Sequence, residues 1–142
     1  MSVYADTSFL VSLYVLDVYC SRATARMKEA LLPILVTPLG RLELLNALSL
    51  RLFRKELTLS QTETGRSLFE ADVTEGIFIL RSLPAAVYER AAAMSRRHTP
   101  KLGTRTLDVL HVASAVMLNA HTFYTFDRRQ RTLAKREALI VP

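Results

Sequence analysis

The chain has 142 residues, of which 50% are hydrophobic, so one folded domain is expected and a disordered chain is excluded. Lysine and arginine outnumber aspartate and glutamate by 19 to 13, which gives a formal charge of +6. Such a charge favours a polyanionic partner such as nucleic acid; the alternative is that it only keeps the protein soluble. No apolar run reaches the roughly 18 residues of a membrane span, the first residues lack the basic region of a secretory signal, and the single Cys20 excludes an internal disulfide. We therefore expect a cytoplasmic protein.

Short apolar runs rich in β-branched residues alternate with longer helical segments, which is typical of an α/β fold with a mainly parallel sheet. We predict one domain over residues 1–142, with a central sheet of five strands and helices on both of its faces. The expected strands cover residues 2–5, 34–37, 77–81, 122–125 and 139–141. The expected helices cover residues 7–16, 22–31 and 39–55, a segment starting at the capping box of Ser60 and Glu63, and residues 84–98, 106–119 and 128–137. Thr99, Pro100 and Gly103 predict a loop between two helices.

Four of the 13 acidic residues have apolar surroundings, whereas most of the others lie beside polar or basic neighbours. Asp6 and Asp127 follow predicted strands, and Glu43 and Asp108 lie near the starts of apolar helices. Each has a structural explanation by itself: a helix cap at Asp6 or Asp108, a turn at Asp127, or a paired carboxylate at Glu43. In a parallel α/β sheet, however, these positions can meet at the carboxyl edge, where such folds place their chemistry. We favour one shared site over four unrelated carboxylates.

Carboxylates that converge repel one another unless a cation shares the site. An oxygen cluster without histidine or cysteine favours a hard ion such as Mg²⁺ or Mn²⁺. Such ions position phosphate oxygens and activate water for attack on phosphorus, and basic side chains around the site would hold a nucleic-acid backbone. The pattern therefore predicts a metal-dependent phosphodiester hydrolase.

Three segments carry a resemblance to a known family: YADTSFL, RLELLNAL and RTLDVLHVASAVMLNAHTFYTFDRRQRTLA. They resemble the PIN-domain ribonucleases, most closely the VapC-type toxins of bacterial and archaeal toxin–antitoxin pairs, over essentially the full chain. The resemblance implies a single PIN-like domain that acts as a metal-dependent endoribonuclease on RNA. It places the catalytic and metal-binding acids of the family on Asp6, Glu43, Asp108 and Asp127. It also implies that Ser8 hydrogen-bonds within the first acidic motif, that Asn46 lies behind Glu43, and that a cognate antitoxin is a partner.

Basic residues beside the acids are the candidates for RNA contact. One group, Arg128, Arg129 and Arg131, follows Asp127 directly. A second group precedes Asp108 and consists of Arg96, Arg97, Lys101 and Arg105. A solvated helix face explains any one of them equally well. His111 lies three residues after Asp108, but a lone histidine on a buried helix is more often a hydrogen-bonded core residue, so we leave it outside the site.

The segment RLELLNALSLRLF places its large apolar side chains over more than one helix face, and FLVSLYVL near the N-terminus does the same. We predict a homodimer, with a groove near these helices that takes an amphipathic antitoxin segment. The alternative is that both helices are buried within one subunit. Two other functions stay open: a PIN-like module that binds RNA or protein without catalysis, and a PIN ribonuclease of RNA processing that has no antitoxin.

Overall fold

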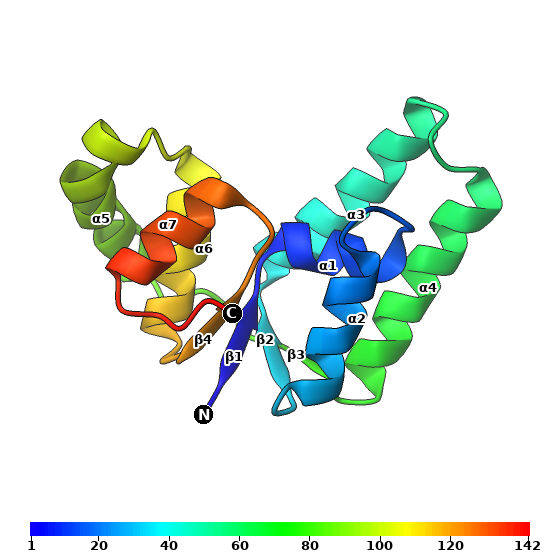
Figure 1. Ribbon diagram of the computed structural model, residues 1–142, viewed down its shortest axis with the longest axis horizontal. Coiled ribbons are helices and arrows are strands. Elements are labelled where there is room, and N and C mark those ends of the chain that lie inside the picture. Colours follow the sequence, from blue (N-terminus) through cyan, green and yellow to red (C-terminus); the bar gives the residue numbers. More distant parts are fainter.

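The computed structural model describes residues 1–142 and contains a four-stranded parallel sheet in the order β3-β2-β1-β4 (Figure 1). Its strands are β1 (Val3–Ala5), β2 (Ile34–Val36), β3 (Phe78–Leu80) and β4 (Thr122–Tyr124). All three neighbouring pairs are parallel, so the four carboxyl ends lie at one edge. The expected α/β class and parallel sheet are confirmed.

The expected fifth strand at residues 139–141 is wrong. Only Ile140 pairs there, through a single parallel bridge to Thr122. The N–H of Leu139 is already donated to the Ala134 carbonyl, and Pro142 has no N–H to donate. The ladder therefore cannot extend in either direction from Ile140.

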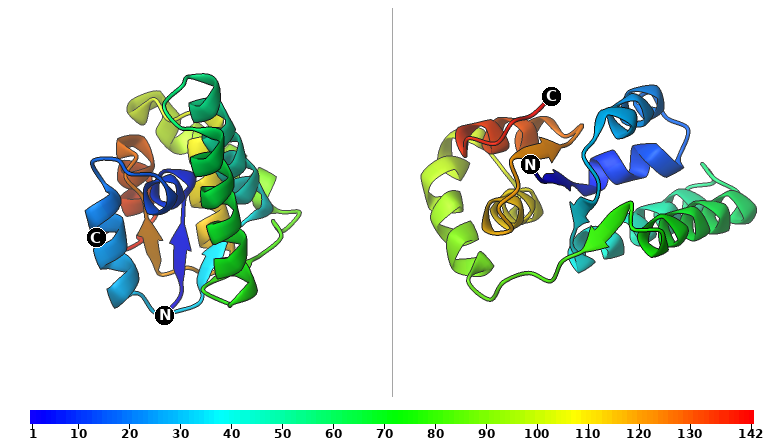
Figure 2. Two further views of the ribbon diagram at one scale, coloured as in Figure 1. Left: turned by 90° about the vertical axis from the view of Figure 1, so that its right-hand side faces the viewer. Right: turned by 90° about the horizontal axis from the view of Figure 1, so that it is seen from below.

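Seven helices surround the sheet: α1 (Thr7–Tyr14), α2 (Cys20–Glu29), α3 (Pro38–Phe53), α4 (Leu59–Thr74), α5 (Val87–Leu102), α6 (Thr106–Met117) and α7 (Arg128–Arg136). Helices α1 to α4 lie on one side of the sheet and α5 to α7 on the other (Figures 1 and 2). Side chains of β1 alternate between two cores, as the strand period of two requires. Val3 and Ala5 pack with the first group of helices, and Tyr4 packs with the second. None of the helices is both long and apolar enough to cross a membrane.

Most helix ends lie one to four residues from their predicted positions, and two of these differences have a clear physical cause. Helix α4 begins two residues earlier than expected, because Thr58 and Gln61, rather than Ser60 and Glu63, form its capping box. Helix α5 continues through the expected loop and ends at Gly103, which takes the left-handed conformation (φ 63°). Pro100 is accommodated in the last turn because it lies on the exposed side of the helix, where water can bond the carbonyl that its missing N–H leaves free.

Candidate active site

The candidate acids lie at the carboxyl edge of the sheet, and three of them, Asp6, Asp108 and Asp127, also cap the start of a helix. Asp6 follows β1 and caps α1 by accepting the Phe9 N–H at 2.9 Å. Asp127 follows β4 and caps α7 by accepting the Gln130 N–H at 2.9 Å. Asp108 in the first turn of α6 accepts the backbone N–H of Arg105 at 2.9 Å. The capping explanation is therefore confirmed for Asp6 and Asp108, and Asp127 is a helix cap as well.

Asp6 is fully buried and is held by three donors. Its Oδ1 accepts hydrogen bonds from the Ser8 hydroxyl at 2.7 Å and from the Phe9 N–H, and its Oδ2 accepts one from the Thr125 hydroxyl at 2.5 Å. Burial raises the pKa of Asp6, and His111 together with these donors offsets part of the rise. Ser8 thus bonds within the first acidic motif, and it also accepts the Phe126 N–H at 2.9 Å, which ties the ends of β1 and β4 together.

Glu43 on α3 belongs to a hydrogen-bond chain that reaches into the core. Its Oε1 accepts from the Thr7 hydroxyl at 3.0 Å and from His111 Nε2 at 2.5 Å, while His111 Nδ1 lies 2.8 Å from the Tyr4 hydroxyl. Burial alone would raise the pKa of Glu43, but the bonds from His111 and Thr7 outweigh it and lower the pKa below its ordinary value. Glu43 Oε2 accepts no hydrogen bond from the protein and is free to bind a ligand.

Asp108 and Asp127 are linked by the guanidinium of Arg105. Arg105 donates to Asp108 from Nε at 3.1 Å and from Nη2 at 3.4 Å, and Nη2 also donates to Asp127 Oδ2 at 3.3 Å. Gln130 completes the Asp108 shell with a bond of 3.2 Å to Oδ1. Burial would raise the pKa of Asp108, but Arg105 lowers it below its ordinary value. The Arg105 side chain is nonetheless 65% exposed, so it can leave this position without opening the core.

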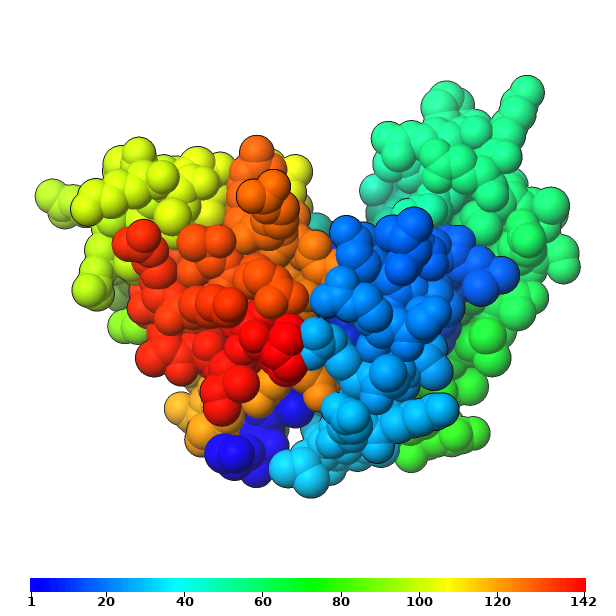
Figure 3. Space-filling model, viewed as in Figure 1, coloured from blue at the N-terminus to red at the C-terminus, as the bar shows by residue number.

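Three of the acids share the wall of one pocket of about 540 Å³. Its lining consists of Thr7, Ser8, Glu43, Arg105, Thr106, Leu107, Asp108, Asp127 and Gln130. Asp6 lies behind this wall and contacts it through Ser8. The space-filling view shows a hollow at the same end of the molecule, between the α5–α7 side and the far end of α3 (Figure 3).

The donor atoms suit a divalent cation in kind, since carboxylate and hydroxyl oxygens face the pocket. No three histidine, cysteine, aspartate or glutamate side chains lie close enough together to hold an ion in this conformation. Between Asp108 and Asp127, the counter-charge is supplied by Arg105. Asp108 and Asp127 would therefore hold a divalent ion only in competition with Arg105.

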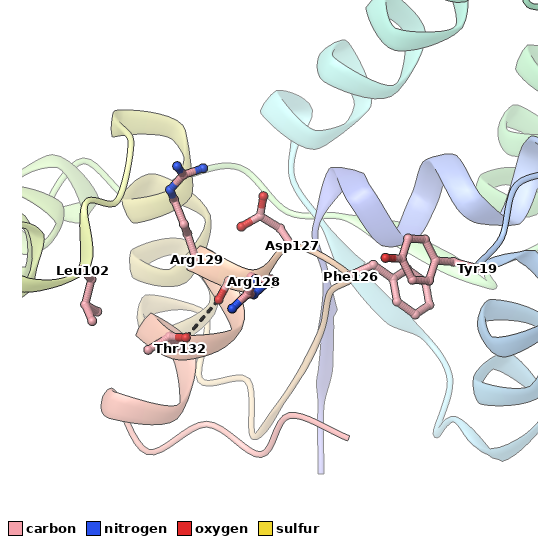
Figure 4. A pocket seen from close by; sticks show the side chains of 7 residues that line it. All are labelled: Tyr19, Leu102, Phe126, Asp127, Arg128, Arg129 and Thr132. Atoms are coloured by element: carbon pink, nitrogen blue, oxygen red, sulfur yellow. Dashed lines mark hydrogen bonds between the residues drawn. The ribbon is translucent and has the colours of Figure 1, made fainter.

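The remaining sequence candidates have mixed positions. Asn46 is exposed on α3 and makes no side-chain hydrogen bond, so the structure does not bring it into the Glu43 network. Arg128 and Arg129 line a second pocket, of about 590 Å³, in which Asp127 lies between them and an aromatic pair (Figure 4). Sequence reasoning left His111 outside the site, although its spacing of three residues from Asp108 on one helix was a usable signal. Thr7 and Thr125 were also missed; each adjoins or lies two residues from an acid already singled out.

A family model described as PIN domain matches residues 3–136. Among solved structures, the Mycobacterium tuberculosis toxin VapC20, described as cleaving the sarcin-ricin loop, is similar with a TM-score of 0.72 and 16% identity, over 92% of this chain and 94% of that one. FitAcB from Neisseria gonorrhoeae gives a TM-score of 0.68 at 16% identity, over 98% and 95% of the two chains. PAE2754 from Pyrobaculum aerophilum gives 0.66 at 15% identity, over 99% and 83%.

No curated protein matches this sequence. At these identities the solved structures show a shared fold. The family model, in contrast, covers nearly the whole chain and includes all four candidate acids. This protein therefore belongs to the PIN-domain family.

Proposed function

We propose that this protein is a Mg²⁺- or Mn²⁺-dependent endoribonuclease whose acidic site is Asp6, Glu43, Asp108 and Asp127. The observation that carries the proposal is the pocket at the carboxyl edge of the sheet, where carboxylates from α3, α6 and the start of α7 share one wall. These acids are far apart in the sequence and lie together only through the fold. Membership of the PIN family and the formal charge of +6 support a nucleic-acid substrate.

When bound, a divalent ion would offset the charge of a phosphodiester and activate water for attack on phosphorus. Asp108 and Asp127 would hold the ion after Arg105 moves aside, and the released guanidinium could then contact a phosphate oxygen. Glu43 is kept ionised by His111 and Thr7, so its free Oε2 can bind the ion or accept a proton from water. Asp6 is fixed in place by its three donors and supports the pocket from behind.

Cleavage of single-stranded RNA in Mg²⁺ or Mn²⁺ tests the proposal. Asp108→Asn and Glu43→Gln should abolish cleavage, because each removes a carboxylate from the pocket wall. Glu89→Gln is the matched control, since Glu89 is exposed in the first turn of α5 and should leave the rate unchanged. Full activity in EDTA, or near-normal turnover of Asp108→Asn, would contradict the proposal. Tight RNA binding with no cleavage in either metal would favour the binding-module alternative.

We extend the proposal to a role as the toxin of a type II, VapBC-like pair with an antitoxin partner. The similar structures include the toxin VapC20 and FitAcB, so the fold is one that such toxins use. An RNA-processing enzyme without an antitoxin has no observation in its favour beyond the shared family. Expression of the chain alone should arrest growth of a host cell, and the Asp108→Asn variant should not.

We also propose a homodimer through the exposed face of α3. Leu44 and Leu48 of this helix are buried within the chain, but Leu42 is 64% exposed and Phe53 is 83% exposed. In the N-terminal segment, Phe9, Leu10 and Val11 are buried in their own chain, but Leu16, beyond the end of α1, is 94% exposed. Phe53→Glu should therefore give a monomer by light scattering at micromolar concentration, whereas Tyr88→Glu, at an exposed aromatic on α5, should not. A wild-type monomer at that concentration would refute the dimer.

A further inference from the structure

Three aromatic rings run from the core of the protein to its surface beside the acidic pocket. Phe9 is fully buried, and its ring lies 5.7 Å from that of Phe126, the residue before Asp127. Tyr19 stacks on Phe126 in turn, with ring centroids 4.6 Å apart and planes at 12° (Figure 4). Its backbone N–H is bonded to Asp17 at 2.8 Å, which fixes the start of α2. Tyr19 is therefore a supported aromatic ring that remains 38% exposed.

This ring lies between two pockets that both contain Asp127. The first, of about 590 Å³, extends from Tyr19 past Asp127 to Arg128 and Arg129 (Figure 4). The second, of about 390 Å³, joins the same aromatic pair to the basic end of α3 at Arg51 and Arg54. Asp127 lines the acidic pocket as well, so the three hollows meet at this carboxylate.

The charges of these pockets suit a chain of phosphates. Arg54, Arg128 and Arg129 form no ion pair with an acidic side chain, so their charges face the solvent. The Arg22 guanidinium lies 5.5 Å from the Phe126 ring centre and adds a further positive charge at the stack. Such arginines bind nucleic-acid backbones irrespective of sequence. Unpaired arginines therefore lie on both sides of Tyr19: Arg128 and Arg129 in the first pocket, and Arg54 in the second.

We propose that Tyr19 is the stacking platform for one unpaired base of a single-stranded RNA. In this arrangement the neighbouring phosphates lie against the arginines of the two pockets, and the backbone passes Asp127. Base stacking on an aromatic side chain works for any base, because every base has a π-face, and it requires that the base leave its own stack. A base-paired duplex cannot meet that requirement, so the platform selects single strands. The inference rests on the proposed ribonuclease function and deepens it by naming the residue that binds a base of the substrate.

Fluorescence anisotropy with a labelled 12-nucleotide RNA in EDTA tests the platform without cleavage. The wild-type protein should bind the single strand more tightly than a duplex of the same length. Tyr19→Ala and Tyr19→Leu should each raise Kd about tenfold, because the base loses its stacking partner. Leucine keeps an apolar cover over Phe126, so its effect isolates the loss of the aromatic plane.

Two controls separate stacking from folding. Tyr19→Phe should retain wild-type affinity, and Tyr88→Ala should have no effect, because Tyr88 is an exposed aromatic on α5. Wild-type affinity of both Tyr19→Ala and Tyr19→Leu, equal binding of duplex and single strand, or no RNA binding at all would overturn the inference. If binding depends on Tyr19 but metal ions give no cleavage, the inference stands and the proposed catalytic function fails. If cleavage occurs and Tyr19 variants bind normally, the reverse holds.

Discussion

Replacement of His111 by alanine should lower the stability of the fold and loosen the site together. The imidazole is 1% exposed and joins Tyr4 on β1 to Glu43 on α3. Its removal leaves the buried Tyr4 hydroxyl without its partner at 2.8 Å, which costs about 1–3 kcal/mol. The cavity adds about 2 kcal/mol, since large-to-alanine changes in cores cost at least that. Glu43 is 24% exposed and can turn to water, so its lost bond adds little.

The summed cost is about 4 kcal/mol, which corresponds to a fall in Tm of roughly 15 °C for a domain of this size. Urea unfolding followed by circular dichroism in EDTA measures it. A double-mutant cycle with Tyr4→Phe tests the reasoning: Tyr4→Phe should cost about 1.5 kcal/mol alone, but in the His111→Ala background it should restore about 1 kcal/mol or more, because it removes the unsatisfied hydroxyl. Simple additivity would refute it and would show that the Tyr4 hydroxyl depends instead on the neighbouring Thr37 hydroxyl.

Two further predictions concern the charges of the site. Burial raises the pKa of Asp6, so the folded protein binds that proton more tightly than the unfolded chain, and stability is lost as the pH rises through the raised pKa. Asp6→Asn should therefore be more stable than the wild type at pH 8 in EDTA, with a difference that shrinks toward pH 4; a variant less stable than the wild type at pH 8 argues against this. Arg105→Gln should tighten Mn²⁺ binding several-fold by calorimetry, since the guanidinium that links Asp108 and Asp127 is removed, while Arg129→Gln should not. Weaker Mn²⁺ binding by Arg105→Gln would show that the arginine assists the ion rather than competing with it.

The sequence alone predicted the parts of the fold that depend on local patterns. The four strands are short apolar runs, fully buried in β1 and β2 and partly exposed in β3. Asp6 and Asp127 mark both a strand end and a helix start, so their placement could be read from neighbouring residues. The prediction of a fifth strand was wrong because the Leu139 N–H is donated to the Ala134 carbonyl at the end of α7, and a local pattern does not reveal this hydrogen bond. Helix α5 includes Pro100 because proline is tolerated on the exposed side of the last helical turn. The sequence prediction treated proline as the end of the helix and did not take its position into account.

Within the site, the acids could be recognised because charges in apolar surroundings are costly. Which residues bond to these acids could not be recognised, since hydrogen bonds between distant segments leave no local pattern; the spacing of His111 from Asp108 placed it near the site but did not identify Glu43 as its partner. His111 and Glu43 are 68 positions apart, and Thr125 is 119 positions from Asp6. The sequence predicted that Arg105 contacts RNA. Its ion pairs with both Asp108 and Asp127 could not be predicted, because they depend on the packing of α6 beside the start of α7.

The chemical ends of the RNA products test the central claim most directly. Hydrolysis by water predicts a 5′-phosphate and a 3′-hydroxyl at each cut, formed only with Mg²⁺ or Mn²⁺ and absent in the Asp108→Asn variant. Mass spectrometry of the fragments from a defined single-stranded RNA distinguishes these ends from others. A 2′,3′-cyclic phosphate, which requires attack by the ribose hydroxyl, or the same fragments in EDTA, would contradict metal-dependent hydrolysis at this acidic site.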